Sequence, residues 1–185
     1  MAALTYDVDQ PSTRNRKTVG LRIIYAIPHV IVAEVWGRLA QILGVIQWFI
    51  VLFTGQRNQG IWDMQNSWIS YYGRAYGYLD LLYDDPYPPF GTDPGQVPVR
   101  QTFTFDGSAD RLTNALRIIW AIPALIIAWA LGVASFVLLV ISWFSILFTG
   151  NQSSGMYDFV RKALRFQIQT QSYVLLMTDT YPKYG

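Results

Sequence analysis

Residues Ile118–Phe148 read IIWAIPALIIAWALGVASFVLLVISWFSILF and contain no charged side chain in 31 positions. A helix needs about 20 consecutive apolar residues to cross roughly 30 Å of hydrocarbon, and a soluble core helix of this length is rare. A second apolar stretch, Val19–Phe53, is interrupted by a few polar and charged residues. The two stretches together predict an integral membrane protein.

The composition of the 185-residue chain supports this class. Hydrophobic residues make up 52% and charged residues 14%, against about 25% charged in an average soluble domain, which excludes a disordered chain. A net charge of +2 leaves no basic excess for binding phosphates, so we expect no nucleic-acid partner. The absence of cysteine, a single histidine and the lack of phosphate-loop or nucleophile motifs predict that the protein is not an enzyme and has no metal site.

Each apolar stretch is long enough for a transmembrane hairpin. A single 31-residue helix would be roughly 46 Å long and would need an extreme tilt. We therefore predict hairpins over residues 18–54 and 112–149, turning at Trp36–Gly37 and near Gly132. Hairpins place nearly all arginines and lysines on one side, as the excess of basic residues in cytoplasmic loops requires. Two long spans are the alternative.

The sequence is also internally duplicated. Arg22–Pro28 matches Arg117–Pro123, and Leu52–Gly55 matches Leu147–Gly150, both at an offset of 95 residues. We predict an all-α membrane fold of two tandem repeats, residues 1–91 and 92–185. If both repeats have an even number of spans, they share one orientation about an axis along the membrane normal.

Each repeat is expected to contain the same elements in the same order. A short strand (around residues 5–7 and over 100–106) precedes the hairpin, and Thr104–Asp106 matches Thr5–Asp7 if four residues are inserted. An amphipathic helix (60–82 and 155–178) follows the hairpin, with apolar residues at helical spacing, and a Tyr-Pro tail ends the repeat. Such helices lie in the headgroup layer.

Aromatic and charged residues near these helices are the candidate contacts. Tryptophan and tyrosine favour the membrane–water boundary. Glu34 and Arg38 lie beside the predicted turn and are spaced to form an ion pair if the helix continues through them. The candidate membrane-interface or partner contacts are Glu34, Trp36, Arg38, Trp62, Trp68, Tyr71, Tyr72, Tyr76, Arg161, Lys162 and Arg165.

His29 is the candidate cofactor residue. It follows Pro28 about ten residues into the first predicted arm, near the middle of the membrane, where histidine can ligate haem or a pigment. A neutral imidazole hydrogen-bonded to a neighbouring helix is the interpretation that we favour.

Five short motifs stand out in the first repeat: Ala26–His29, Trp48-Phe49, Phe53–Gly55, Tyr76–Tyr78 and Asp85–Phe90. In these motifs the chain resembles a bacterial membrane family known as domain of unknown function 4389. The second copy departs from the pattern, because Ala124 replaces His29 and Lys183-Tyr184 replaces Pro89-Phe90. The resemblance implies a multi-pass protein of the bacterial cytoplasmic membrane with both termini inside, and it implies no activity.

These observations lead to three functional hypotheses. The first is a non-catalytic accessory or scaffolding subunit of a larger integral membrane complex, in contact with membrane lipids. The second is a lipid- or small-molecule-binding or transport protein that uses the cleft between the repeats. The third is a pigment- or haem-binding subunit that uses His29. We predict no obligatory cofactor and expect bound lipid.

Overall fold

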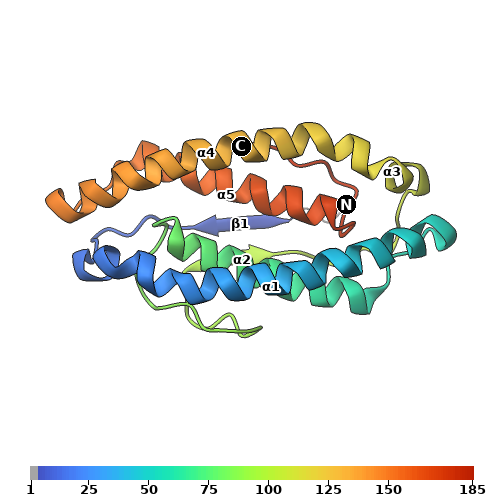
Figure 1. Cartoon of the computed structure of the whole chain (residues 1–185), viewed down its shortest axis with the longest axis horizontal. Helices are drawn as coiled ribbons and strands as arrows, with labels where there is room; N and C mark the ends of the chain where they lie inside the picture. Colours follow the sequence, from blue (N-terminus) through green and yellow to red (C-terminus); the bar gives the residue numbers. More distant parts are fainter. Residues whose placement is uncertain (1–3) are drawn as a thin grey trace.

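The computed structural model describes residues 4–185, and this part of the chain is mostly helical (Figure 1). Two long helices alternate with two shorter ones, and a two-stranded sheet completes the fold. The elements in chain order are β1 (Thr5–Val8), α1 (Arg16–Thr54), α2 (Gln59–Leu79), β2 (Val99–Thr102), α3 (Arg111–Ala115), α4 (Arg117–Thr149) and α5 (Ser154–Val174).

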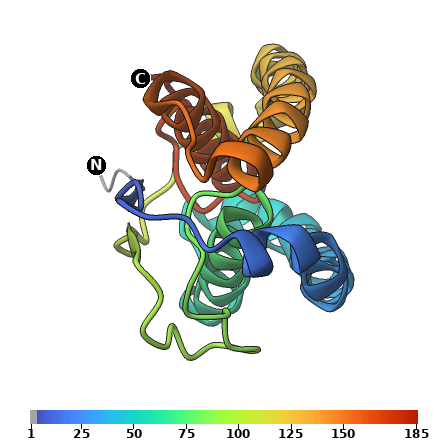
Figure 2. The same cartoon turned by 90° about the vertical axis from the view of Figure 1, so that its left-hand side faces the viewer.

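The elements form three layers. Figure 1 shows α1 and α4 running in opposite directions along the long axis, with α2 and α5 behind them. The end-on view of Figure 2 shows α1 and α4 on one side, α2 and α5 in the middle, and β1 with the C-terminal end of the chain on the other side. Helix α2 packs on α1 and α5 packs on α4, while β1 contacts α5 and β2 contacts α2.

The predicted hairpins are wrong, because each apolar stretch contains one continuous helix. Helix α1 runs for 39 residues through Trp36–Gly37, and α4 runs for 33 residues through Gly132. The glycines serve close packing rather than chain reversal. A Cβ atom at Gly37 would lie 2.9 Å from the Trp68 ring, and one at Gly132 would lie 3.1 Å from Gln167 Nε2.

The predicted second strand is too long. β1 and β2 pair antiparallel with Tyr6 opposite Gln101, and β2 ends at Thr102. Phe103 and Phe105 instead pack on the Trp62 ring, with centroids 5.2 and 5.5 Å away. Burying these two rings takes precedence over extending the ladder, so the proposed match between Thr5–Asp7 and Thr104–Asp106 does not describe equivalent strands.

The two repeats are related by a pseudo-twofold axis. Trp48 Nε1 donates to the Asn114 carbonyl at 2.9 Å, and the equivalent Trp143 Nε1 donates to the Val19 carbonyl at 2.9 Å. Tyr6 and Gln101 are themselves separated by 95 residues and pair with each other, so the axis passes through this pair. Because it exchanges α1 with the antiparallel α4 within one layer, the axis is perpendicular to the layers.

A buried arginine closes each repeat. Arg22 donates to the Tyr83 carbonyl at 2.7 Å and to Asp84 Oδ1 at 2.8 Å. Its equivalent, Arg117, donates to the Thr178 carbonyl at 2.9 Å and to Asp179. Both arginines are at most 3% exposed. Each therefore ties the start of a long helix to the chain that follows the shorter helix.

Candidate functional site

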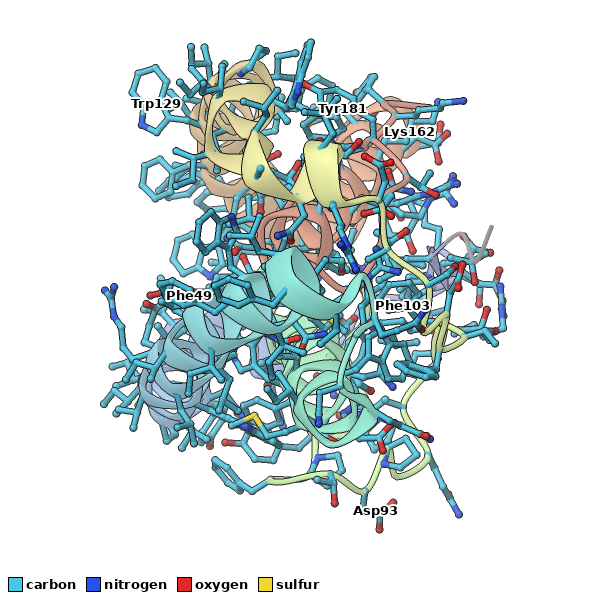
Figure 3. The ribbon with its side chains drawn as sticks, turned by 90° about the vertical axis from the view of Figure 1, so that its right-hand side faces the viewer. Phe49, Asp93, Phe103, Trp129, Lys162 and Tyr181 are labelled. Carbon is cyan, nitrogen blue, oxygen red and sulfur yellow. The ribbon has the colours of Figure 1, made fainter. Side chains whose placement is uncertain are left out.

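The outer surface of the two long helices is mainly apolar, with Glu34, Arg38 and Gln41 of α1 as exposed polar exceptions. Exposed large side chains include Ile118 (75%), Trp129 (72%) and Phe53 (73%). We call the exposed apolar side chains of α1 and α4 the apolar face. Figure 3 shows Trp129 and Phe49 projecting from one side of the molecule, away from Lys162. Exposed patches of this extent mark a surface that contacts lipid or another protein.

Small residues explain why the bulky side chains lie outside. The buried stripe of α1 contains Ala26, Ala33, Gly37, Ala40 and Gly44, which let α2 approach closely. Both long helices have the length and composition to cross a membrane. Only 28% of the most apolar 18-residue window of α1 and 11% of that of α4 is buried, so neither resembles the core helix of a soluble protein.

The opposite surface, formed by α5 and the two strands, is charged. Arg100 pairs with Asp7 at 2.9 Å and with Asp9 at 2.6 Å, and Arg161 pairs with Asp7 and Asp158. The hydrogen bond from Arg100 holds the pKa of the Asp9 carboxyl below its usual value. We call this surface, with its solvated ion pairs, the polar face.

Several residues predicted to lie at the membrane interface are inside the protein. Trp62 and Trp68 are 4% exposed and Tyr71 is fully buried, so this prediction is wrong for all three. Trp68 Nε1 donates to the Ala33 carbonyl at 2.8 Å, and Trp62 Nε1 donates to the Met177 carbonyl at 3.2 Å. Indole N–H groups need such partners when buried. Tyr72 and Tyr76 are partly exposed, with their rings stacked 4.2 Å apart.

Glu34 and Arg38 are both exposed on α1 but do not pair with each other. Glu34 Oε1 accepts a hydrogen bond from the Tyr76 hydroxyl at 3.1 Å, and Arg38 Nη1 donates to Gln41 Oε1 at 3.4 Å. Trp36 is partly buried and lies 5.7 Å from Tyr71, centroid to centroid. The expected ion pair is therefore replaced by a contact between α1 and α2.

The basic residues of α5 lie in a layer remote from the apolar face. Arg161, Lys162 and Arg165 are all partly buried, and Figure 3 places Lys162 on the side opposite Trp129. That these residues contact a membrane interface or a partner stays a prediction.

His29 is enclosed by aromatic side chains. Its Nδ1 lies 2.7 Å from the Tyr71 hydroxyl, and its ring stacks on Phe90 at 4.2 Å and lies 4.7 Å from Tyr87. Nε2 is buried without a hydrogen-bond partner in residues 4–185. A haem iron or pigment metal could reach Nε2 only if covering side chains moved, whereas the geometry directly supports a neutral, hydrogen-bonded imidazole.

A cleft of about 520 Å³ opens between the repeats. Its walls come from α4 (Trp129 and Phe136 among them), from Tyr72 of α2, and from Gln167 and Gln171 of α5. Sequence reasoning missed the residues from α4 and α5. The available signal was the difference between the repeats, because Gln167 and Gln171 stand where the first repeat has Tyr72 and Tyr76.

The comparison with protein families agrees with the duplication. The family described as Domain of unknown function (DUF4389) matches residues 16–91 and again residues 111–184. The chain belongs to the DUF4389 family. Both DUF4389 copies begin where a long helical stretch begins, at Arg16 of α1 and Arg111 of α3. No curated protein and no solved structure matches the chain.

Proposed function

We propose that this DUF4389 protein is a non-catalytic accessory protein that lies flat in one leaflet of a membrane and presents its polar face to a partner in a larger membrane complex. The observation that carries the proposal is the separation of the two faces. The apolar face covers both long helices, and the solvated ion pairs of Arg100 and Arg161 lie on the strands and α5. Figure 3 shows Trp129 and Lys162 on opposite sides of the molecule.

The arrangement of the helices favours this orientation over membrane spanning. At about 1.5 Å per residue, α1 is about 58 Å long and α4 about 50 Å, well beyond about 30 Å of hydrocarbon. The axes of α1, α2, α4 and α5 all lie along the long axis of the molecule (Figure 1). If α1 and α4 spanned the membrane, α5 and the strands would therefore also enter the lipid. The exposed Arg100–Asp9 pair would then be costly to bury.

Arginines at both ends of the apolar face support an attachment to anionic lipid. Gly150, at the end of α4, lies beside the Arg16 guanidinium, and Gly55, at the end of α1, lies beside that of Arg111. Basic groups at this level attract the anionic headgroups of the cytoplasmic leaflet. We propose the cytoplasmic side of the bacterial inner membrane, with both chain ends in the aqueous phase.

Flotation with vesicles of phosphatidylethanolamine and phosphatidylglycerol tests the proposal. The wild type should float with the vesicles, and the double variant Ile42→Asp/Ile126→Asp should stay in the dense fraction, because both side chains are about 60% exposed on the apolar face. The matched control is Thr92→Asp/Gln96→Asp, in the exposed loop before β2, and it should float. A wild type that fails to float would refute membrane attachment.

The accessory role needs a second measurement. Natively extracted protein should co-purify with a stoichiometric partner, and a charge reversal on the polar face, Lys162→Glu, should weaken that association without affecting flotation. Recovery of the natively extracted protein alone and monodisperse would contradict the accessory role.

A further inference from the structure

The cleft between the repeats opens on the apolar face. Two of its lining residues, Trp129 and Phe136, are 72% and 66% exposed and belong to that face. Tyr72 from α2 and Gln167 and Gln171 from α5 line the cleft together with them. A molecule in the surrounding leaflet would therefore reach polar groups by entering past Trp129 and Phe136 of α4.

The cleft exists because the two repeats differ in side-chain size at three equivalent positions. In the first repeat Trp68 packs against Gly37, the Tyr72 and Tyr76 rings stack at 4.2 Å, and Tyr76 hydrogen-bonds to Glu34. The second repeat has alanine and two glutamines at the same three positions. Gln167 Nε2 lies beside Gly132, and the smaller side chains leave a cleft open between α4 and α5.

The polar groups of the cleft are uncharged. The side-chain amides of Gln167 and Gln171 and the side chain of Tyr72 line the cleft. Amides and a phenol can both donate and accept hydrogen bonds. Among residues 4–185 no charged side chain lines the cleft, so the lining is better suited to binding ester carbonyls than to binding a phosphate group.

We infer that the cleft binds one glycerophospholipid of the leaflet, with the glycerol ester groups at Gln167 and Gln171 and an acyl chain against Trp129 and Phe136. This inference rests on the proposed function, in which the apolar face lies in one leaflet of the membrane. The ester groups of a bilayer lie between the headgroups and the hydrocarbon, at the depth of an in-plane helix. Because the contacts involve the esters, the site should not discriminate between headgroups.

Native mass spectrometry can test the site. The protein is reconstituted into vesicles of phosphatidylethanolamine and phosphatidylglycerol in a ratio of about 3:1. It is then extracted in mild detergent, and the two lipids are distinguished by their masses. The wild type should retain one phospholipid, in proportion to the vesicle composition. Gln167→Leu/Gln171→Leu should lower the retained fraction about tenfold, as expected for the loss of one to two hydrogen bonds.

A second variant and a matched control complete the experiment. Gln167→Tyr/Gln171→Tyr gives the second repeat the side chains of the first, fills the cleft and should also abolish retention. Gln41→Leu removes an exposed amide of α1 that does not line the cleft, and this variant should retain lipid. Circular dichroism confirms the fold of each variant.

The outcomes separate the two proposals. If the wild type floats with vesicles but both cleft variants retain phospholipid as the wild type does, the inferred site is wrong while membrane attachment stands. A strong preference for one headgroup would also overturn the ester-based site. If the wild type does not float, the proposed function itself fails.

Discussion

The buried arginines show how single residues hold this fold together. Arg22 is 1% exposed and Asp84 is 5% exposed, so the charges of this pair are almost fully removed from solvent. Two backbone carbonyls and the Asp84 carboxylate accept from the same guanidinium. Arg14 is a second cation at this site, 3.3 Å from Asp84 Oδ1. Among residues 4–185, removing Arg22 therefore leaves the buried carboxylate with one cationic partner in place of two, which is destabilising in a poorly solvated site.

We expect Arg22→Met to lower the free energy of unfolding by about 3 kcal/mol, because the Tyr78 and Tyr83 carbonyls lose their donor and the Asp84 carboxylate keeps Arg14, at 3.3 Å, as its remaining cationic partner. The loss in the double variant Arg22→Met/Asp84→Asn should be smaller than the sum of the losses in the two single variants. Denaturant unfolding in detergent micelles would measure all three proteins. Strictly additive losses would show that the pair is not energetically coupled.

Asp80 gives a pH dependence at the end of α2. Burial raises the pKa of its carboxyl to about 7, against about 3.9 in an unfolded chain. The folded state therefore favours the protonated carboxyl. The contribution of Asp80 to the free energy of unfolding is fully present below about pH 4 and is lost as the pH rises to about 7. Asp80→Asn should raise the melting temperature at pH 8 and change it little at pH 4.

The control for Asp80 is Asp63→Asn, on the exposed side of the same helix. Its melting temperature should follow the wild type at both pH values. Thermal unfolding by circular dichroism in micelles measures all three proteins. A melting temperature of Asp80→Asn that shifts equally at pH 4 and pH 8 would contradict the assignment.

At the scale of elements, the close packing of α2 on α1 depends on Gly37. The Trp68 ring occupies the space where a Cβ atom would lie, 2.9 Å away. Gly37→Val should displace this ring and lower the free energy of unfolding by about 1–3 kcal/mol, as overpacking does. Gly60→Ala in α2 is the control, because its Cβ would meet only Asn58 Oδ1 at 3.4 Å, and it should match or exceed wild-type stability.

The sequence was sufficient for the elements whose side chains repeat regularly. Helical spacing of apolar residues indicated α2 and α5, and the offset of 95 residues indicated the duplication. The sequence was not sufficient to predict the role of Gly37. A glycine that allows a chain reversal and a glycine that allows a close contact with Trp68 cannot be distinguished before the fold is known. The cleft required knowing that α4, α5 and Tyr72 meet, which is a matter of tertiary packing.

At the scale of the whole molecule, the flat arrangement makes a topological prediction. The chain has no cysteine, so a single introduced cysteine is the only site that a maleimide labels. Lys17→Cys and Gln56→Cys flank the two ends of α1, and both should react with a membrane-impermeant maleimide from the same side. Reaction of the two positions from opposite sides would show that α1 spans the membrane.

The contacts between repeats make a prediction about assembly. β1 pairs with β2, and Arg57 of the first repeat pairs with Asp179 of the second at 2.7 Å. Residues 1–91 and 92–185, expressed together as separate chains, should therefore co-purify in a 1:1 complex. Trp48→Phe/Trp143→Phe removes both indole contacts and should reduce the yield of that complex. Recovery of each half alone as a folded monomer would contradict the prediction.

The pseudo-twofold axis bears on how the two halves can diverge. In a dimer of identical chains, every substitution appears twice, so a hollow in one subunit is necessarily copied in the other. A fused chain is free of this constraint, and within residues 4–185 the aromatic enclosure of His29 lies in the first half, while the glutamines that line the cleft come from the second. Fusion thus allows the two halves to carry different side chains at equivalent positions.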